Sequence, residues 1–164
     1  MRLAQDPIRS TRSQRLVMSV LRPVWRLRRG MTLGAQGVIV DGEGRVLLVR
    51  HSYRPGWCFP GGGVEWGETL EFALARELEE EVGVSLTGPA VLHGMFSNHS
   101  NFPGDHIGVF LVRDWTRQGE YRARGEIAET GMFAPDALPA KTDRGTRNRV
   151  EEIFGGAPVS GVWA

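Results

Sequence analysis

The sequence predicts an α/β fold in which a mixed β-sheet packs against helices. Short runs rich in β-branched residues recur along the chain, an amphipathic helical segment interrupts them, and a second helical segment follows the last of them. The 164 residues are 41% apolar and 24% charged, which is typical of one globular domain. The predicted order of elements is therefore strand, strand, helix, three further strands and helix.

Turn residues and apolar periodicity place the individual strands. Two strands, 33–40 and 45–50, flank an Asp-Gly-Glu-Gly turn and are predicted to form a hairpin. Residues 57–59 are expected to be extended, and the glycines at 61–63 are expected to interrupt regular structure. Three later strands are predicted at 91–96, 106–113 and 126–134, and a closing helix at 146–154.

The central helix is predicted over residues 70–82. Thr69 suits its N-cap, and Gly83 is expected to end it. An apolar stripe at spacings of three and four residues is expected to face the sheet. Its members are Phe72, Ala75, Leu78 and Val82.

Three carboxylates are predicted on the opposite face of this helix. Glu77, Glu80 and Glu81 fall within one turn, and at ~5 Å each pair repels by about 3 kcal/mol at an effective dielectric constant of about 20. Arg76 relieves part of this repulsion, whereas a divalent cation would balance it, and oxygen ligands favour Mg²⁺ or Mn²⁺. The alternative is a solvated acidic helix face. The glycine loop 61–63 favours the metal site, because its backbone can approach a ligand closely.

Residues 62–84, GGVEWGETLEFALARELEEEVGV, carry a specific pattern. They resemble the Nudix box, G-x5-E-x7-R-E-U-x-E-E-x-G-U with U apolar, at every defined position. The resemblance implies an α/β/α sandwich, with a mixed β-sheet flanked by helices, that hydrolyses a nucleoside diphosphate linked to another moiety. The defined positions are Gly62, Glu68, Arg76, Glu77, Leu78, Glu80, Glu81, Gly83 and Val84.

The resemblance also implies roles for individual box residues. Arg76 would hold the metal-binding glutamates in position, Glu68 would brace the turn from loop to helix, and Gly83 would be structural. The metal, Mg²⁺ or Mn²⁺ in its place, would be bound by one carbonyl and three carboxylates. These ligands are Gly62, Glu77, Glu80 and Glu81.

The box leaves the general base open. Hydrolysis needs a carboxylate that takes a proton from the attacking water. Glu77 is the first candidate. Glu126 is the second, because the family often brings an acid from a downstream segment to the site, and Glu129 is the third. The alternative for Glu126 is a surface acid.

Candidate substrate contacts lie in loops. Arg50, His51 and Arg54 flank the strand-to-loop transition before the glycines, where one of them could meet a phosphate; the alternative is a solvated loop. Trp66 and Phe102 could stack on a base. Nucleoside triphosphates, ADP-ribose and nucleotide sugars all remain open as substrates, and an RNA 5′ end is less favoured. The rival function is a non-catalytic nucleotide-ligand sensor on the same fold, although such sensors commonly lose box carboxylates, which are intact here.

The first 30 residues hold eight arginines and one acid, Asp6, and are predicted to be a basic N-terminal extension of a Nudix hydrolase domain at 31–164. Three interpretations stay open: a solvated extension, a helix docked on its own domain or on the twin subunit of a homodimer, and, least favoured, contact with nucleic acid or a membrane surface.

No segment approaches the ~20 apolar residues of a transmembrane helix. Cys58 is the only cysteine, which excludes an internal disulfide and fits a cytoplasmic location.

Overall fold

The architecture is that of a computed structural model, which describes residues 30–117 and 126–164. Residues from Thr32 to Ala164 belong to one compact unit. The predicted basic extension, residues 1–30, lies outside the described residues except for Gly30, so its three interpretations stay predictions. Within the described residues, no helix combines the length and the apolar character that crossing a membrane requires.

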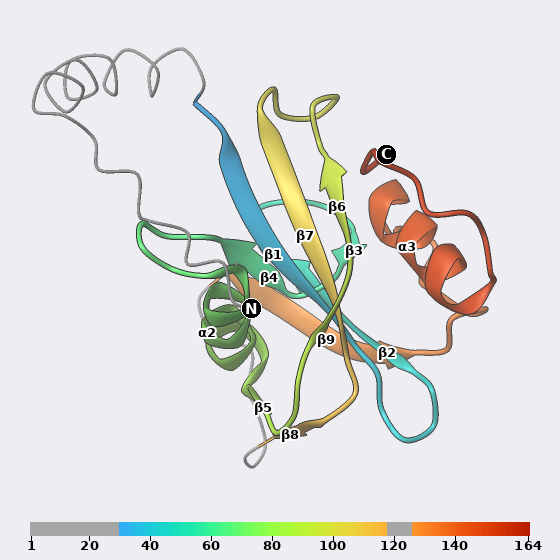
Figure 1. Ribbon diagram of the computed structural model, residues 1–164. Helices are drawn as coiled ribbons and strands as arrows, with labels where there is room; N and C mark the ends of the chain where they lie inside the picture. Colours follow the sequence, from blue (N-terminus) through green and yellow to red (C-terminus); the bar gives the residue numbers. More distant parts are fainter. Residues whose placement is uncertain (1–29, 118–125) are drawn as a thin grey trace, which may run out of the picture. The chain divides into compact units, whose positions relative to one another are not determined.

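The predicted strands and helices occur in the predicted order, and additional short strands lie between them. The elements are β1 (Thr32–Ile39), β2 (Val46–His51), β3 (Trp57–Cys58), β4 (Gly61–Gly63), α2 (Leu70–Val82), β5 (Val84–Leu86), β6 (Val91–Ser97), β7 (Asp105–Val112), β8 (Trp115–Arg117), β9 (Ile127–Phe133) and α3 (Arg144–Phe154) (Figure 1). In the described residues they form three sheets, ordered β4-β1-β7-β6, β3-β2-β9 and β5-β8. β1 runs parallel to β7 and antiparallel to β4, so the main sheet is mixed.

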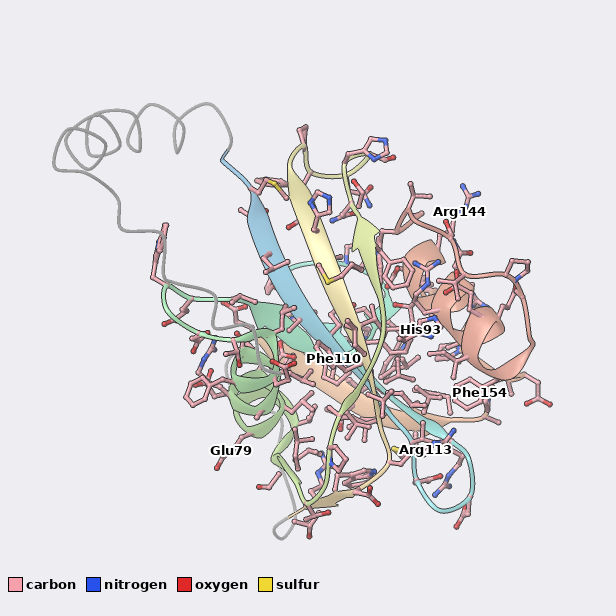
Figure 2. All side chains as sticks on the ribbon, in the orientation of Figure 1. Glu79, His93, Phe110, Arg113, Arg144 and Phe154 are labelled. Atoms are coloured by element: carbon pink, nitrogen blue, oxygen red, sulfur yellow. The ribbon has the colours of Figure 1, made fainter. Side chains whose placement is uncertain are left out.

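The two helices cover opposite faces of the strands (Figure 1). Successive residues of β1 alternate between two apolar cores: Ile39 packs with the residues of α2, and Val38 packs with those of α3. Phe110 of β7 lies in the core beneath α2 (Figure 2). Because both faces of β2 are covered, its residues Val46–Val49 form a continuous apolar run. The predicted α/β/α sandwich is confirmed.

Helix α2 has the predicted ends, but only two members of the predicted apolar stripe, Leu78 and Val82, are buried. The Thr69 hydroxyl accepts a hydrogen bond from the Phe72 amide, and Gly83 ends the helix in the left-handed conformation at φ 64°. Phe72, however, is 62% exposed. The buried side chains belong to Ala73, Leu74, Leu78 and Val82. β1 carries no side chain at Gly37, and the leucines of α2 pack into that space, which turns Phe72 outward.

The predicted hairpin between the first two strands is wrong. β1 and β2 share one isolated bridge, Val40 to Val46, and then separate into different sheets. The edges of β1 are taken by β4 and β7, and those of β2 by β3 and β9. Both strands are buried on two faces, so each is stabilised more by an interior position in its own sheet than by a two-stranded ribbon.

The glycines expected to interrupt regular structure instead form the short strand β4. Gly61 pairs with Gln36, and Gly62 pairs with Ala35 of β1. Gly61 has φ 138°, and a Cβ there would collide with the Ala35 carbonyl, so a side chain is excluded. β5 and β8, which pair with each other, are also absent from the sequence-based prediction because each spans only three residues.

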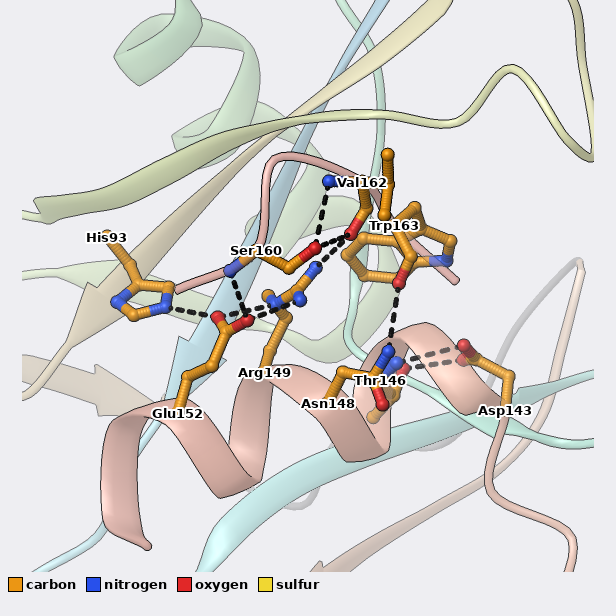
Figure 3. Close-up of polar contacts among 9 residues, drawn as sticks. All are labelled: His93, Asp143, Thr146, Asn148, Arg149, Glu152, Ser160, Val162 and Trp163. Atoms are coloured by element: carbon orange, nitrogen blue, oxygen red, sulfur yellow. Dashed lines mark hydrogen bonds and ion pairs between the residues drawn. The ribbon is translucent and has the colours of Figure 1, made fainter. Parts of the chain in front are cut away.

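Helix α3 carries a buried network of charges (Figure 3). The guanidinium of Arg149 is fully buried and donates to the Glu152 carboxylate at 2.7 and 2.5 Å. Glu152 also contacts His93 Nε2 at 2.9 Å and accepts from the Ser160 amide at 2.9 Å. The Arg149 guanidinium lies 3.8 Å from the centre of the Phe96 ring. Burial alone would raise the pKa of Glu152, but the hydrogen bonds from its partners outweigh burial and lower it.

Candidate active site

An open cavity of about 470 Å³ lies where β4 meets α2. It is lined by Gly61, Gly62 and Gly63, by the start of β1, and by residues of the loop after β2. Two of its lining residues, His51 and Arg54, are basic. Four are acidic: Glu77, Glu81, Asp105 and Glu126. The lining is therefore strongly acidic, although the whole chain carries a formal charge of only +1.

Arg76 joins the loop before α2 to the helix itself. Its Nε and Nη2 atoms donate to the two oxygens of Glu68 at 2.9 and 3.0 Å. Its Nη1 atom donates to Glu77 at 2.7 Å, and its Nη2 atom also reaches the Gly63 carbonyl at 3.0 Å. Glu68 in turn accepts from the Glu65 amide at 2.8 Å. Glu68 therefore ties the loop to the helix, and Arg76 fixes one Glu77 oxygen.

The backbone of β4 lies directly against two carboxylates. A Cβ at Gly62 would collide with the Glu77 carboxyl group, so only glycine permits this approach. The Gly61 amide donates to Glu81 Oε2 at 2.8 Å. The Glu81 side chain is only 15% exposed, and burial, reinforced by the charge of Glu77, raises its pKa to about 7.

His51 and Arg54 line the same cavity, and His51 lies near the Glu81 oxygen that the Gly61 amide does not bind. His51 is 5% exposed, and its Nε2 atom lies 4.0 Å from Glu81 Oε1. Burial, followed by the charge of Arg54, lowers the pKa of His51. Arg54 Nη2 donates to the Cys58 sulfur at 2.8 Å. Burial raises the pKa of the Cys58 thiol to about 11, so this thiol stays protonated at neutral pH.

The structure brings some predicted site residues together and places others elsewhere. His51, Arg54, Gly62, Glu77, Glu81 and Glu126 line the cavity. Four of the residues predicted to bind metal or substrate do not line it. Glu80 is 63% exposed, Trp66 is 87% exposed, Phe102 is 58% exposed, and Arg50 is paired with Glu129 at 2.8 Å.

The candidates for the general base differ in their surroundings. Glu77 and Glu126 both line the cavity, whereas Glu129 is paired with Arg50 on β2. The Glu126 carbonyl accepts from the Ser52 amide at 2.8 Å, which holds the start of β9 close to the loop after β2. Glu79, at an undefined position of the box, lies on the outer surface of α2 (Figure 2).

The donor set of the cavity suits a hard divalent cation. Glu77, Glu81 and the β4 backbone offer only oxygen ligands on this side, which favour Mg²⁺ or Mn²⁺. The carboxylate of Glu77 occupies the space that a side chain at Gly62 would fill, so the Gly62 backbone and the carboxylate are within reach of one ion. Within residues 30–117 and 126–164, no three His, Cys, Asp or Glu side chains are already gathered around one point.

Several cavity residues were not predicted from the sequence. Asp105 accepts from the Thr32 hydroxyl at 2.6 Å and from the Asn98 amide at 2.8 Å. Tyr53 and Gln36 complete this part of the lining. One signal for Gln36 was present, because it is the only side chain with a polar group in the otherwise apolar run 33–40.

Comparison with known proteins places the chain in one family. Residues 31–152 match the model of the NUDIX domain. An 8-oxo-dGTP diphosphatase from Proteus vulgaris is 39% identical over 90 residues, which cover 51% of this chain and 78% of the relative. An ADP-ribose pyrophosphatase from Methanocaldococcus jannaschii is 33% identical over 105 residues, which cover 62% of this chain and 61% of the relative.

Solved structures agree with these sequence matches. The MutT NUDIX hydrolase from Burkholderia pseudomallei superposes with a TM-score of 0.65 at 32% identity, covering 75% of this chain and 98% of that one. A NUDIX hydrolase from Nitrosomonas europaea gives the same TM-score at 24% identity, which shows a shared fold. The box residues, the cavity that they line and the match over residues 31–152 lead to one assignment: the chain belongs to the NUDIX family and is a pyrophosphohydrolase.

Proposed function

We propose that this chain catalyses the Mg²⁺-dependent hydrolysis of a pyrophosphate bond in a nucleoside diphosphate linked to another moiety. One observation carries the proposal: the β4 backbone lies against Glu77 and Glu81 in a cavity with four acidic side chains and a single arginine. Such a lining repels a polyphosphate unless cations bind with it. Mn²⁺ offers the same ligand preference and is proposed as a substitute.

The proposed ligands are the Gly62 carbonyl and the carboxylates of Glu77, Glu80 and Glu81. When bound, Mg²⁺ would neutralise the phosphoryl oxygens and lower the pKa of a coordinated water. Glu81 is supported by its burial, because a buried carboxylate with no arginine or lysine bonded to it among the described residues gains most from an added cation. Glu80 is supported by the box pattern alone, because its side chain is 63% exposed and does not line the cavity.

The remaining roles belong to residues that hold or move protons. Arg76 is proposed as a positioning residue, because it binds one oxygen of Glu77 and leaves the other free to face the cavity. Glu77 is the first candidate for the base that takes the proton of the attacking water, and Glu126 is the second. His51 and Arg54 line the same cavity and are proposed to contact phosphate.

The substrate classes can be ranked for testing. Nucleoside triphosphates come first, because the chain matches 78% of a relative named for a nucleoside triphosphate. ADP-ribose comes next, since the match covers 61% of the relative named for it, and nucleotide sugars follow. An RNA 5′ end comes last, because the RNA pyrophosphohydrolase of Halorhodospira halophila, 47% identical over 55 residues, is matched over only 34% of this chain and 30% of its own length. The cytoplasmic location, the homodimer and the roles of residues 1–30 stay predictions.

The decisive experiment is a screen of these compounds with Mg²⁺, with Mn²⁺ and with EDTA, in which phosphate release and the nucleotide product are both measured. We expect turnover that disappears in EDTA. Tight binding of one compound without turnover of any would instead support the nucleotide sensor.

Variants of the two candidate bases separate their roles. Glu77→Gln and Glu126→Gln should be compared with Glu79→Gln, a matched control on the outer surface of α2. Loss of the base is expected to lower kcat by about 10²–10⁴-fold and to remove the acidic limb of the pH–rate profile. Unchanged kcat in either variant would exclude that residue as the base.

A further inference from the structure

Gln36 holds a buried polar atom that the fold does not use. Its Oε1 atom is shielded from solvent and has no hydrogen-bond partner among the described residues. Buried acceptors are nearly always paired in native proteins, so an unpaired one needs an explanation. Gln36 also lines the cavity, together with Ile107 of the neighbouring strand β7.

The position of Gln36 follows from the alternation of β1. Ala35 packs in the core beneath α2, so Gln36 projects from the opposite face of the sheet. Its backbone pairs with Gly61, the residue whose amide binds Glu81. Adjacent strands lie about 4.8 Å apart, so the carboxamide of Gln36 is one strand away from the proposed diphosphate site.

The cavity lining combines charged and neutral side chains. Glu77 and Glu81 of α2 are acidic, whereas Gln36 of β1 and Ile107 of β7 are uncharged. The carboxylate of Asp105, on the same strand as Ile107, is already engaged by Thr32 and Asn98. The Gln36 oxygen is an acceptor in this lining that no described residue engages.

We propose that Gln36 is a specificity-determining residue whose carboxamide oxygen accepts a hydrogen bond from an N–H or O–H group of the substrate's nucleoside part. The proposal rests on the proposed function, since it places the diphosphate beside Glu77 and Glu81 in the same cavity. A phosphate oxygen cannot be the partner, because it too is an acceptor. The terminal torsion of a glutamine is broad, so rotation of the carboxamide can turn the shielded oxygen toward a ligand in the cavity. A site with an acceptor for a substrate donor discriminates strongly against an analogue without that donor. An apolar pocket discriminates between such compounds much less.

The test replaces Gln36 by Met, which keeps the length of the side chain and removes the acceptor. For the best substrate we expect kcat/KM to fall at least tenfold, mainly through a higher KM. The analogue for comparison lacks the donor, as the 2′-deoxy or the N-methylated compound does. The native protein should have a lower kcat/KM for this analogue than for the substrate, whereas Gln36→Met should have similar values for both. The affinity for inorganic pyrophosphate with Mg²⁺ should be unchanged.

Thermal unfolding distinguishes recognition from a structural role. Removing an unpaired buried acceptor should leave the Tm of Gln36→Met unchanged or raise it. A lower Tm with a parallel loss on all substrates would show a structural role and overturn the proposal, and so would unchanged selectivity. If the native protein turns over no compound, the proposed function fails. In that case, nucleoside 5′-monophosphate binding tests Gln36 alone. Weaker binding by Gln36→Met than by the native protein would support its role, and equal binding would contradict it.

Discussion

Two buried glutamates, Glu81 in the cavity and Glu152 on α3, have opposite surroundings. The side chains are 15% and 3% exposed, respectively. Glu152 is enclosed by Arg149, His93 and the Ser160 amide, and its pKa is lowered. Glu81 receives one amide hydrogen bond and has His51 at 4.0 Å, and burial raises its pKa to about 7.

The difference shows how a fold separates structural from functional charge. Around Glu152, the protein supplies the cation itself and closes the site with the segment after α3 (Figure 3). Around Glu81, the nearest side chains include another carboxylate, and the site opens to solvent through the cavity. A buried charge that the protein leaves without a bonded cation is a candidate functional site, whereas a fully paired one holds elements together.

The largest expected effect is on catalysis at Glu81. Glu81→Gln keeps the oxygen that accepts from the Gly61 amide but removes the charge that would bind Mg²⁺, so kcat should fall by about 10⁴-fold or more. Phosphate release at saturating Mg²⁺ measures this loss, and circular dichroism checks the fold. Glu79→Gln should retain full activity. Full Mg²⁺-dependent turnover by Glu81→Gln would refute the metal assignment.

The second effect is on stability at Glu152. Glu152→Gln leaves the fully buried Arg149 without its counter-charge, which should lower the free energy of unfolding by about 3 kcal/mol. Urea denaturation measures this loss. The double variant Arg149→Met, Glu152→Leu removes both charges and should recover most of it. If the single and double variants are equally unstable, packing and not charge pairing explains the network.

The third expected effect is a gain in stability, in contrast to the loss expected at Glu152. In EDTA at pH 8, Glu81→Gln should raise the free energy of unfolding by on the order of 2 kcal/mol, because it removes an ionised group from a site that favours the neutral form. A folded-state pKa raised to about 7 contributes stability that is full below the ordinary glutamate pKa and is lost as the pH rises through 7. The difference in the free energy of unfolding between Glu81→Gln and the native protein should therefore decrease toward pH 5. A variant that is less stable than the native protein at pH 8 would contradict this view of Glu81.

The smallest effect is the acid dependence of the α3 network. The lowered pKa of Glu152 contributes stability above the ordinary glutamate pKa, and this contribution is lost as the pH falls through the folded-state value. The stability difference between the native protein and Glu152→Gln should thus shrink below about pH 4. Urea midpoints at pH 7, 5 and 3.5 measure it. A difference that stays constant over this range would show that Glu152 acts by shape alone.

Features coded by neighbouring residues were predictable from the sequence. The ends of α2 were predicted because Thr69 and Gly83 act on the helix that they adjoin. The box spacing likewise placed Glu77 and Glu81 beside the glycine loop. In contrast, spacing alone did not show which apolar face of α2 is buried, because the space left by Gly37 on a distant strand decides it.

Features created by strand pairing could not be predicted in this way. Asp105 reaches Thr32 only because β7 aligns in parallel with β1, and Gln36 joins the cavity only because β4 pairs beside it. A pairing in the other sheet, β2 with β9, sets Arg50 opposite Glu129 and away from the cavity. The register between distant strands depends on the whole sheet, and no local sequence pattern determines it.

The long separation between paired strands also bears on how the protein is made. Thr32 and Asp105 are 73 positions apart, and Arg50 and Glu129 are 79 apart. A ribosome adds about 5–20 residues per second, so the first strands wait several seconds or longer for their partners. The box helix can form early, but neither main sheet is complete until residues 105–112 and 127–133 have emerged. Exposed apolar strands in that interval make the nascent chain a natural client for chaperones, and slow refolding in vitro is expected for the same reason.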